Sequence, residues 1–100
     1  MVFMGPLDYQ ASRSLRDRIQ AVVRSHDGPV IVDMMDVHFL DTAGMSLLMD
    51  IQSEVAERPI LRLAHGSQPE RLILLGHLDS LFLVQTERPA IEPWATPVKL

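Results

Sequence analysis

Apolar residues occur along this chain with two different spacings, and the two spacings alternate. Val30–Val32 is a continuous β-branched run, which is typical of buried strands in parallel sheets. Ile60-Leu61-Arg62-Leu63 is a second, mostly apolar run, and it predicts another short strand. Before each run, apolar residues recur every three or four positions, as on an amphipathic helix. The two stripes comprise Leu15, Ile19, Val22 and Val23, and then Gly44, Leu47, Leu48, Ile51 and Val55. The pattern predicts helices that alternate with strands.

Capping and turn-forming residues set the expected limits of these elements. Ser, Asp and Asn favour helix starts, Pro favours the first helical turn, and Gly favours the end. The chain is expected to begin with a strand end at Val2–Met4, followed by a helix that Asp8 or Ser12 caps. A second helix, capped by Asp41, is expected from Thr42 to Glu57, and a third begins at Pro69 and ends at Gly76. Leu81–Val84 is either a strand or the start of a last helix.

Polar side chains gather where the central strand is expected to stop. The run Val30–Val32 breaks at Asp33, a second short run Val37–Leu40 ends at Asp41, and a helix follows. Sites in α/β sheets are built at the carboxyl ends of strands, and a helix N-terminus presents free N–H groups. The sequence therefore places a candidate site at Asp41–Gly44.

Composition narrows the function classes. The 100 residues, 47% of them hydrophobic, suit one compact domain. The net charge of −4 argues against a nucleic-acid-binding face, and the absence of cysteine excludes disulfides and thiolate chemistry. No apolar run approaches the ~20 residues that cross a membrane. No nucleophile–base pair or phosphate-binding glycine loop is visible, so we expect neither catalysis nor a cofactor.

Two further groups of residues have competing interpretations. Four potential ligands, Asp33, Asp36, His38 and Asp41, are close in sequence, but their alternation between strand and turn does not bring them together, so we expect no metal site. A second stripe on the predicted second helix either widens its buried face or forms an adaptable contact surface. This stripe consists of Met45, Met49, Gln52 and Ala56.

Three blocks of sequence resemble STAS domains. Gly5-Pro6-Leu7-Asp8 resembles the entry to their first helix, and V-I-V-D-M-M-D-V-H-F-L-D-T-A-G-M at 30–45 resembles their central signature. L-R-L-A at 61–64, with E-R-L-I-L-L-G-H-L-D-S-L-F at 70–82, resembles their closing segment. The resemblance implies an α/β fold, a mostly parallel sheet with helices packed on it, that lacks the family's first strand. It covers residues 2–84 and leaves 85–100 as a proline-containing tail.

The resemblance implies a non-catalytic domain that acts by binding another protein in the cytoplasm. The first hypothesis is a regulator similar to anti-sigma factor antagonists, whose partner is a kinase-like anti-sigma factor. The alternative is the cytoplasmic STAS domain of a SulP-type anion transporter, tethered to its membrane domain, or the STAS subunit of a lipid-transport complex.

The family's phosphoacceptor usually lies directly before the signature glycine, where this chain has Ala43. The resemblance therefore implies that the usual switch is absent. Thr42 is the remaining candidate acceptor, although a threonine at a helix start more often forms a hydrogen bond with the backbone. Ser46 is more simply interpreted as a solvent-facing residue of the helix. The expected partner-binding residues are Asp41, Thr42, Ala43, Gly44, Met45 and Met49.

A sheet that lacks the family's initial hairpin exposes a free edge at Val2–Met4. We expect that edge to be covered by a second copy of the chain, which would make a homodimer, or by the tail Pro89–Leu100. Ile91 and Trp94 are the expected anchors if the tail folds back.

Overall fold

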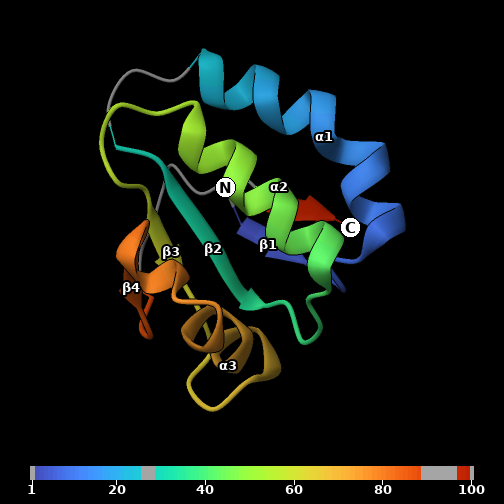
Figure 1. The fold of residues 1–100 in the computed structure, drawn as a ribbon. Coiled ribbons are helices and arrows are strands. Elements are labelled where there is room, and N and C mark those ends of the chain that lie inside the picture. The colour runs from blue at the N-terminus through green and yellow to red at the C-terminus, as the bar shows by residue number, and fades with distance from the viewer. Residues whose placement is uncertain (1, 26–28, 89–96, 100) are drawn as a thin grey trace.

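The computed structural model describes residues 2–25, 29–88 and 97–99. Three helices alternate with four strands, and a fifth strand follows near the C-terminus (Figure 1). The elements are β1 (Val2–Met4), α1 (Tyr9–Arg24), β2 (Ile31–Asp36), α2 (Thr42–Ser53), β3 (Ile60–Arg62), α3 (Gln68–Leu75), the 3-10 turn η1 (Leu78–Ser80), β4 (Leu83–Gln85) and β5 (Pro97–Lys99).

The strands form one sheet in the order β4-β3-β2-β1-β5, and every neighbouring pair is parallel. Helices α1 and α2 lie side by side across one face of this sheet, and α3 lies near the carboxyl end of β2 (Figure 1). The predicted α/β architecture is therefore confirmed. Parallel strands need crossover connections, and the helices between them supply these.

The core lies between the sheet and the two helices that cover it. Alternate strand residues point into it, because successive side chains of a strand face opposite sides. The inner stripes of α1 and α2 complete the core. Val22, which was expected in the stripe of α1, is half-exposed, whereas the next residue, Val23, is buried. The fully or nearly fully buried members include Phe3, Val32, Met34, Leu61, Leu15, Ile19, Leu47, Leu48 and Ile51.

The caps of α1 and α2 are among those expected, and the limits of two helices differ from the prediction. Asp8 caps α1, while Ser12 is buried inside that helix. Helix α3 starts one residue before Pro69. Helix α2 ends at Ser53 instead of Glu57, because its last turn tightens: the Glu54 N–H bonds the Ile51 carbonyl, three residues back.

Strand β2 is longer than the sequence pattern predicts. The apolar run breaks at Asp33, yet the strand continues through this residue to Asp36. The polar side chain is tolerated because charged and N–H groups surround it, as described below. The expected second run Val37–Leu40 is not a strand; only Leu40 forms a single bridge, with Leu7. Of the two interpretations of Leu81–Val84, the strand is correct, as β4.

The C-terminal end of the chain supplies the fifth strand. Residues 97–99 pair in parallel with β1, on the side of β1 away from β2. Of the two expected covers for the β1 edge, the structure contains the chain's own tail. Ile91 and Trp94, the anchors expected for it, lie outside the described residues.

Candidate functional site

The loop before α2 is held in place by main-chain and amide hydrogen bonds. The Leu7 N–H donates to the Phe39 carbonyl at 2.9 Å, and the Asp41 N–H donates to the Leu7 carbonyl at 3.3 Å. From α3, the Gln68 amide accepts from the Leu40 N–H at 2.9 Å and donates to the Leu40 carbonyl at 2.8 Å. Segments from three parts of the chain thus fix where α2 begins.

Asp41 is a structural cap that joins two helices. One carboxylate oxygen accepts from the Gly44 N–H at 2.9 Å, which satisfies an N–H of the first turn of α2. The other oxygen accepts from the Tyr9 N–H at 2.9 Å, at the start of α1. Because both oxygens are engaged with the backbone, the arrangement gives Asp41 a positioning role.

Gly44 is required by a close approach of the backbone. A Cβ atom at this position would lie 2.3 Å from the Leu7 carbonyl oxygen and 2.6 Å from the Leu40 Cδ1 atom. The first turn of α2 can therefore pack against the β1–α1 connection only with glycine here.

Thr42 and Ala43 lie on the open side of this helix start. Thr42 is exposed and Ala43 is half-buried. The expected hydrogen bond from the Thr42 hydroxyl to the backbone is not formed with any described residue, since Asp41 already caps the turn. The structure thus leaves an accessible hydroxyl at Thr42 and a methyl group at Ala43.

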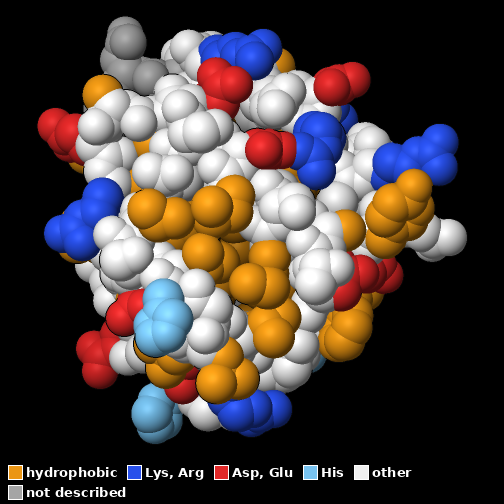
Figure 2. Space-filling view, viewed as in Figure 1, with side chains coloured by type: hydrophobic (Ala, Val, Ile, Leu, Met, Phe, Trp, Pro, Cys, Tyr) orange, Lys and Arg blue, Asp and Glu red, His pale blue; other side chains and the backbone are white. Residues whose placement is uncertain are grey.

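An apolar surface extends from this helix start toward α3. Met45 is half-buried and reaches the end of α3, where its methyl group would lie 3.2 Å from a Cβ at Gly76. Met49 is 38% exposed and Leu75 is 78% exposed. Figure 2 shows hydrophobic side chains gathered over α2 and α3 on this face. We call Met45, Met49 and Leu75 the α2–α3 surface.

The sequence pattern identified only part of this surface. Met45 and Met49 were candidates, and each is at least partly accessible. Of their predicted companions, Gln52 is half-buried and Ala56 lies beyond the end of α2. Leu75 was missed because it lies in an apolar run, and an apolar run alone does not show which member faces solvent.

A second polar cluster lies on the other face of the sheet, and no sequence pattern predicted it. Asp33 is only 1% exposed and points away from the core that Val32 and Met34 fill. Arg88 donates two hydrogen bonds to its carboxylate, both 2.6 Å, and one to Asp36 at 3.2 Å. An arginine far along the chain thus joins two of the four potential ligands named from the sequence, Asp33 and Asp36.

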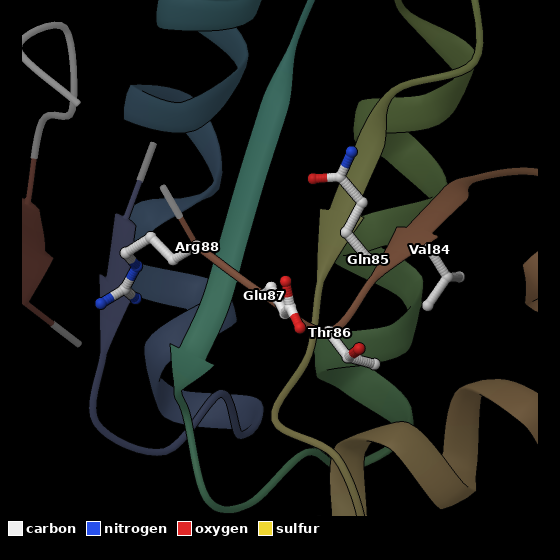
Figure 3. Close-up of a pocket in the computed structure, with 5 residues that line it drawn as sticks. All are labelled: Val84, Gln85, Thr86, Glu87 and Arg88. Atoms are coloured by element: carbon white, nitrogen blue, oxygen red, sulfur yellow. The ribbon is translucent and has the colours of Figure 1, made fainter. Parts of the chain in front are cut away.

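This cluster extends to the neighbouring strands. Arg62 of β3 lies 3.7 Å from the Asp33 carboxylate, and its Nε atom donates to the Gln85 side chain at 3.1 Å. Val84–Arg88 line a shallow open pocket, and Figure 3 shows this segment crossing β2 with Arg88 beside β1. The chain after β4 is thus anchored in the middle of the sheet.

The cluster holds Asp33 in its charged form. Burial acts to raise the pKa of Asp33, but hydrogen bonds from Arg88 and the Met35 N–H, with the charges of Arg88 and Arg62, outweigh burial. The pKa of Asp33 therefore lies below its usual value.

This shift predicts a loss of stability in acid. Because folding lowers the pKa of Asp33, its stabilising contribution is complete above the unfolded-state pKa of about 3.9 and disappears as the pH falls through the folded-state pKa. Urea unfolding from about pH 6 to about pH 2 should show this decline. The decline should be smaller in Arg88→Gln and unchanged in Arg13→Gln, an exposed control; equal declines in all three proteins would contradict the prediction.

The described residues contain no group of three or more His, Cys, Asp and Glu side chains placed to hold a metal ion. Within the same part of the chain, no helix combines the length and apolar character needed to cross a membrane.

A parallel α/β sheet whose central strand leads through an Asp-capped turn into α2 defines the class of fold. The family model for the STAS domain matches residues 1–87. The chain therefore belongs to the STAS domain family, as its sequence resemblance implied. A search of curated proteins found no match.

Proposed function

We propose that this STAS domain is a non-catalytic regulatory module, similar to anti-sigma factor antagonists, that binds a kinase-like anti-sigma factor in the cytoplasm. The observation that carries the proposal is the juxtaposition at the start of α2. An accessible, rigidly held turn at Thr42 and Ala43 lies beside the exposed apolar side chains of the α2–α3 surface. Exposed apolar groups next to a polar rim are typical of protein-binding surfaces.

The chemistry of the turn supports binding in preference to catalysis. Both carboxylate oxygens of Asp41 accept backbone hydrogen bonds, from Gly44 and Tyr9. The nearby Thr42 hydroxyl has no histidine or carboxylate bonded to it among the described residues, and an unactivated hydroxyl is a weak nucleophile.

The residues of the same turn also support the proposal that partner binding is not controlled by phosphorylation. Ala43 occupies the position directly before Gly44 and has no hydroxyl. A phosphate on Thr42 would add about −1.5 to −2 charges next to the Asp41 carboxylate, which already occupies the helix N-terminus. This repulsion disfavours Thr42 as a replacement acceptor.

One test of this proposal concerns that switch. Incubation of the protein with ATP and the anti-sigma factor kinases of the same genome should produce little or no phosphorylation. An Ala43→Ser variant, which restores a hydroxyl before Gly44, should be labelled more strongly. Strong labelling of the wild-type protein that maps to Thr42 would overturn the claim that the switch is absent.

Another test of this proposal concerns the binding surface. Met45→Glu and Thr42→Glu should each weaken binding to the partner by at least about tenfold, because each places a charge in an interface that would be desolvated. Calorimetric titration measures this effect. Val22→Glu is the matched control, since Val22 is half-exposed on α1, outside the α2–α3 surface.

The control variant should bind like the wild type, and all three variants should keep the wild-type circular dichroism spectrum. Unchanged affinity in both surface variants would move the interface elsewhere. Binding to the membrane domain of an anion transporter or to a lipid-transport complex, with no binding to any anti-sigma factor, would favour the alternative function.

A further inference from the structure

Gln68, the first residue of α3, forms two hydrogen bonds with one residue of a distant segment. Its side-chain amide accepts from the Leu40 N–H at 2.9 Å and donates to the Leu40 carbonyl at 2.8 Å. Leu40 lies directly before the Asp41 cap and is 1% exposed, so its main-chain groups have little access to water. The amide therefore ties the start of α3 to the loop before α2.

This amide takes the place of a neighbouring strand. Leu7 bonds to the Phe39 carbonyl and to the Asp41 N–H, as in a parallel pair of strands. In that pattern the N–H and the carbonyl of the residue between them, Leu40, point to the opposite side. Gln68 lies on that side and presents one donor and one acceptor, as the main chain of a strand would.

The two bonds make the chemistry of position 68 specific. Among side chains of about the length of glutamine, an ionised glutamate accepts but cannot donate, and lysine donates but cannot accept. Methionine offers only a weak acceptor. Any of these residues would leave at least one main-chain group of Leu40 without its bond, and an unmade bond of a buried group is costly.

Helix α3 has few other contacts to fix its position. It has eight residues, and helices this short are not stable in isolation. Only two of them, Pro69 and Ile73, are buried. At the far end of α3, the Met45 side chain of α2 reaches Gly76, beside the exposed Leu75. Gln68 at one end and Met45 at the other thus hold α3 against the segment that forms the start of α2.

We propose that Gln68 is a positioning residue of the partner-binding surface, an inference that rests on the function proposed above. Its amide acts through Leu40 and sets where the turn at Thr42 and Ala43 lies relative to Leu75. A surface whose parts are already in place loses less conformational entropy when a partner binds. Loss of the amide therefore lowers the affinity, although every side chain of the α2–α3 surface is still present.

Gln68→Met tests the positioning role in the free protein, because methionine has a similar length and forms neither bond well. Amide hydrogen exchange at the Leu40 N–H, followed by NMR, should be at least tenfold faster than in the wild type. The amide signals of Thr42 and Ala43, which Gln68 does not contact through any hydrogen bond between described residues, should also shift. Signal positions report the native structure, so a general loss of stability does not move them.

The same variant tests the consequence for binding. In calorimetric titration with the anti-sigma factor kinase that the wild type binds, Gln68→Met should bind at least tenfold more weakly. Gln20→Met is the matched control, because Gln20 is also half-buried but lies on α1. It should leave the affinity and the signals of Thr42 and Ala43 unchanged. Urea unfolding checks that both variants are folded under the conditions of the titration.

If Gln68→Met fails to fold, as judged by circular dichroism, Gln68→Glu replaces it in both experiments. Glutamate has nearly the same shape and keeps the acceptor for the Leu40 N–H, but when ionised it cannot donate to the Leu40 carbonyl. The signals of Thr42 and Ala43 should shift in this variant too, and its affinity should fall in the same direction.

Two results would overturn the proposal. One is a folded Gln68 variant in which the signals of Thr42 and Ala43 stay at their wild-type positions. The other is a folded variant that binds the kinase with wild-type affinity. If the wild-type protein itself binds no anti-sigma factor kinase, the function proposed above fails, whereas the NMR measurements need no partner and still decide whether Gln68 positions the turn.

Discussion

Gly44→Ala is expected to destabilise the protein by about 3 kcal/mol, the upper end of the usual range for overpacked sites. The added Cβ would lie 2.3 Å from the Leu7 carbonyl oxygen, which is a backbone atom. That oxygen cannot move away cheaply, because it accepts the hydrogen bond from the Asp41 N–H that holds the loop before α2. Helix α2 would have to shift, and the Asp41 cap would be disturbed with it.

Urea unfolding measures this loss, and Gly76→Ala is its matched control. Gly76 has a φ of −82°, which any residue adopts. Its Cβ would lie 3.2 Å from the end of the flexible Met45 side chain, 3.3 Å from the Leu72 carbonyl oxygen and 3.7 Å from the Leu78 Cγ atom, all of them farther than the approach at Gly44. The control should cost less than about 1 kcal/mol. Similar losses in the two variants would show that the close approach at Gly44 is not the cause.

The elements that the sequence predicts well are those set by neighbouring residues. A helix cap acts over three positions, so Asp8 and Asp41 were identifiable from their local sequence. The inner helical stripes repeat every three or four residues, and Leu47, Leu48 and Ile51 are all buried as expected. The position of the candidate site at the start of α2 followed from these local signals.

The features that escaped prediction depend on residues far apart in the chain. Asp33 looked like a strand end because its partner Arg88 lies 55 positions away. The Gln68 amide that fixes Leu40 is 28 positions away. Strand β5 has three residues, one of them proline, and so has no periodicity of its own; its pairing with β1 stabilises it.

This division explains why the two faces of the molecule were predicted unequally. The turn at Asp41–Gly44 is built from one continuous segment, and its residue types indicate its geometry. The polar cluster around Asp33 is assembled from β2, β3 and the chain after β4, and no spacing within any one of them indicates it.

Leu48→Ala is expected to lower the free energy of unfolding by about 2–5 kcal/mol. Leu48 is fully buried in the inner stripe of α2, so truncation removes apolar contacts and leaves a cavity that the sheet cannot close. Urea unfolding of the purified variant measures the change.

Met49→Ala, one residue along the same helix, separates the core stripe from the α2–α3 surface. Met49 is 38% exposed, so its truncation should cost less than about 1 kcal/mol of stability. It should nevertheless weaken partner binding, whereas Leu48→Ala should reduce binding only through the unfolded fraction of the protein. If Leu48→Ala were as stable as Met49→Ala, the assignment of Leu48 to the core would fail; if Met49→Ala bound normally, Met49 would be excluded from the interface. Because the two residues are adjacent on one helix, their opposite effects would separate the face that folds the domain from the face that contacts its partner.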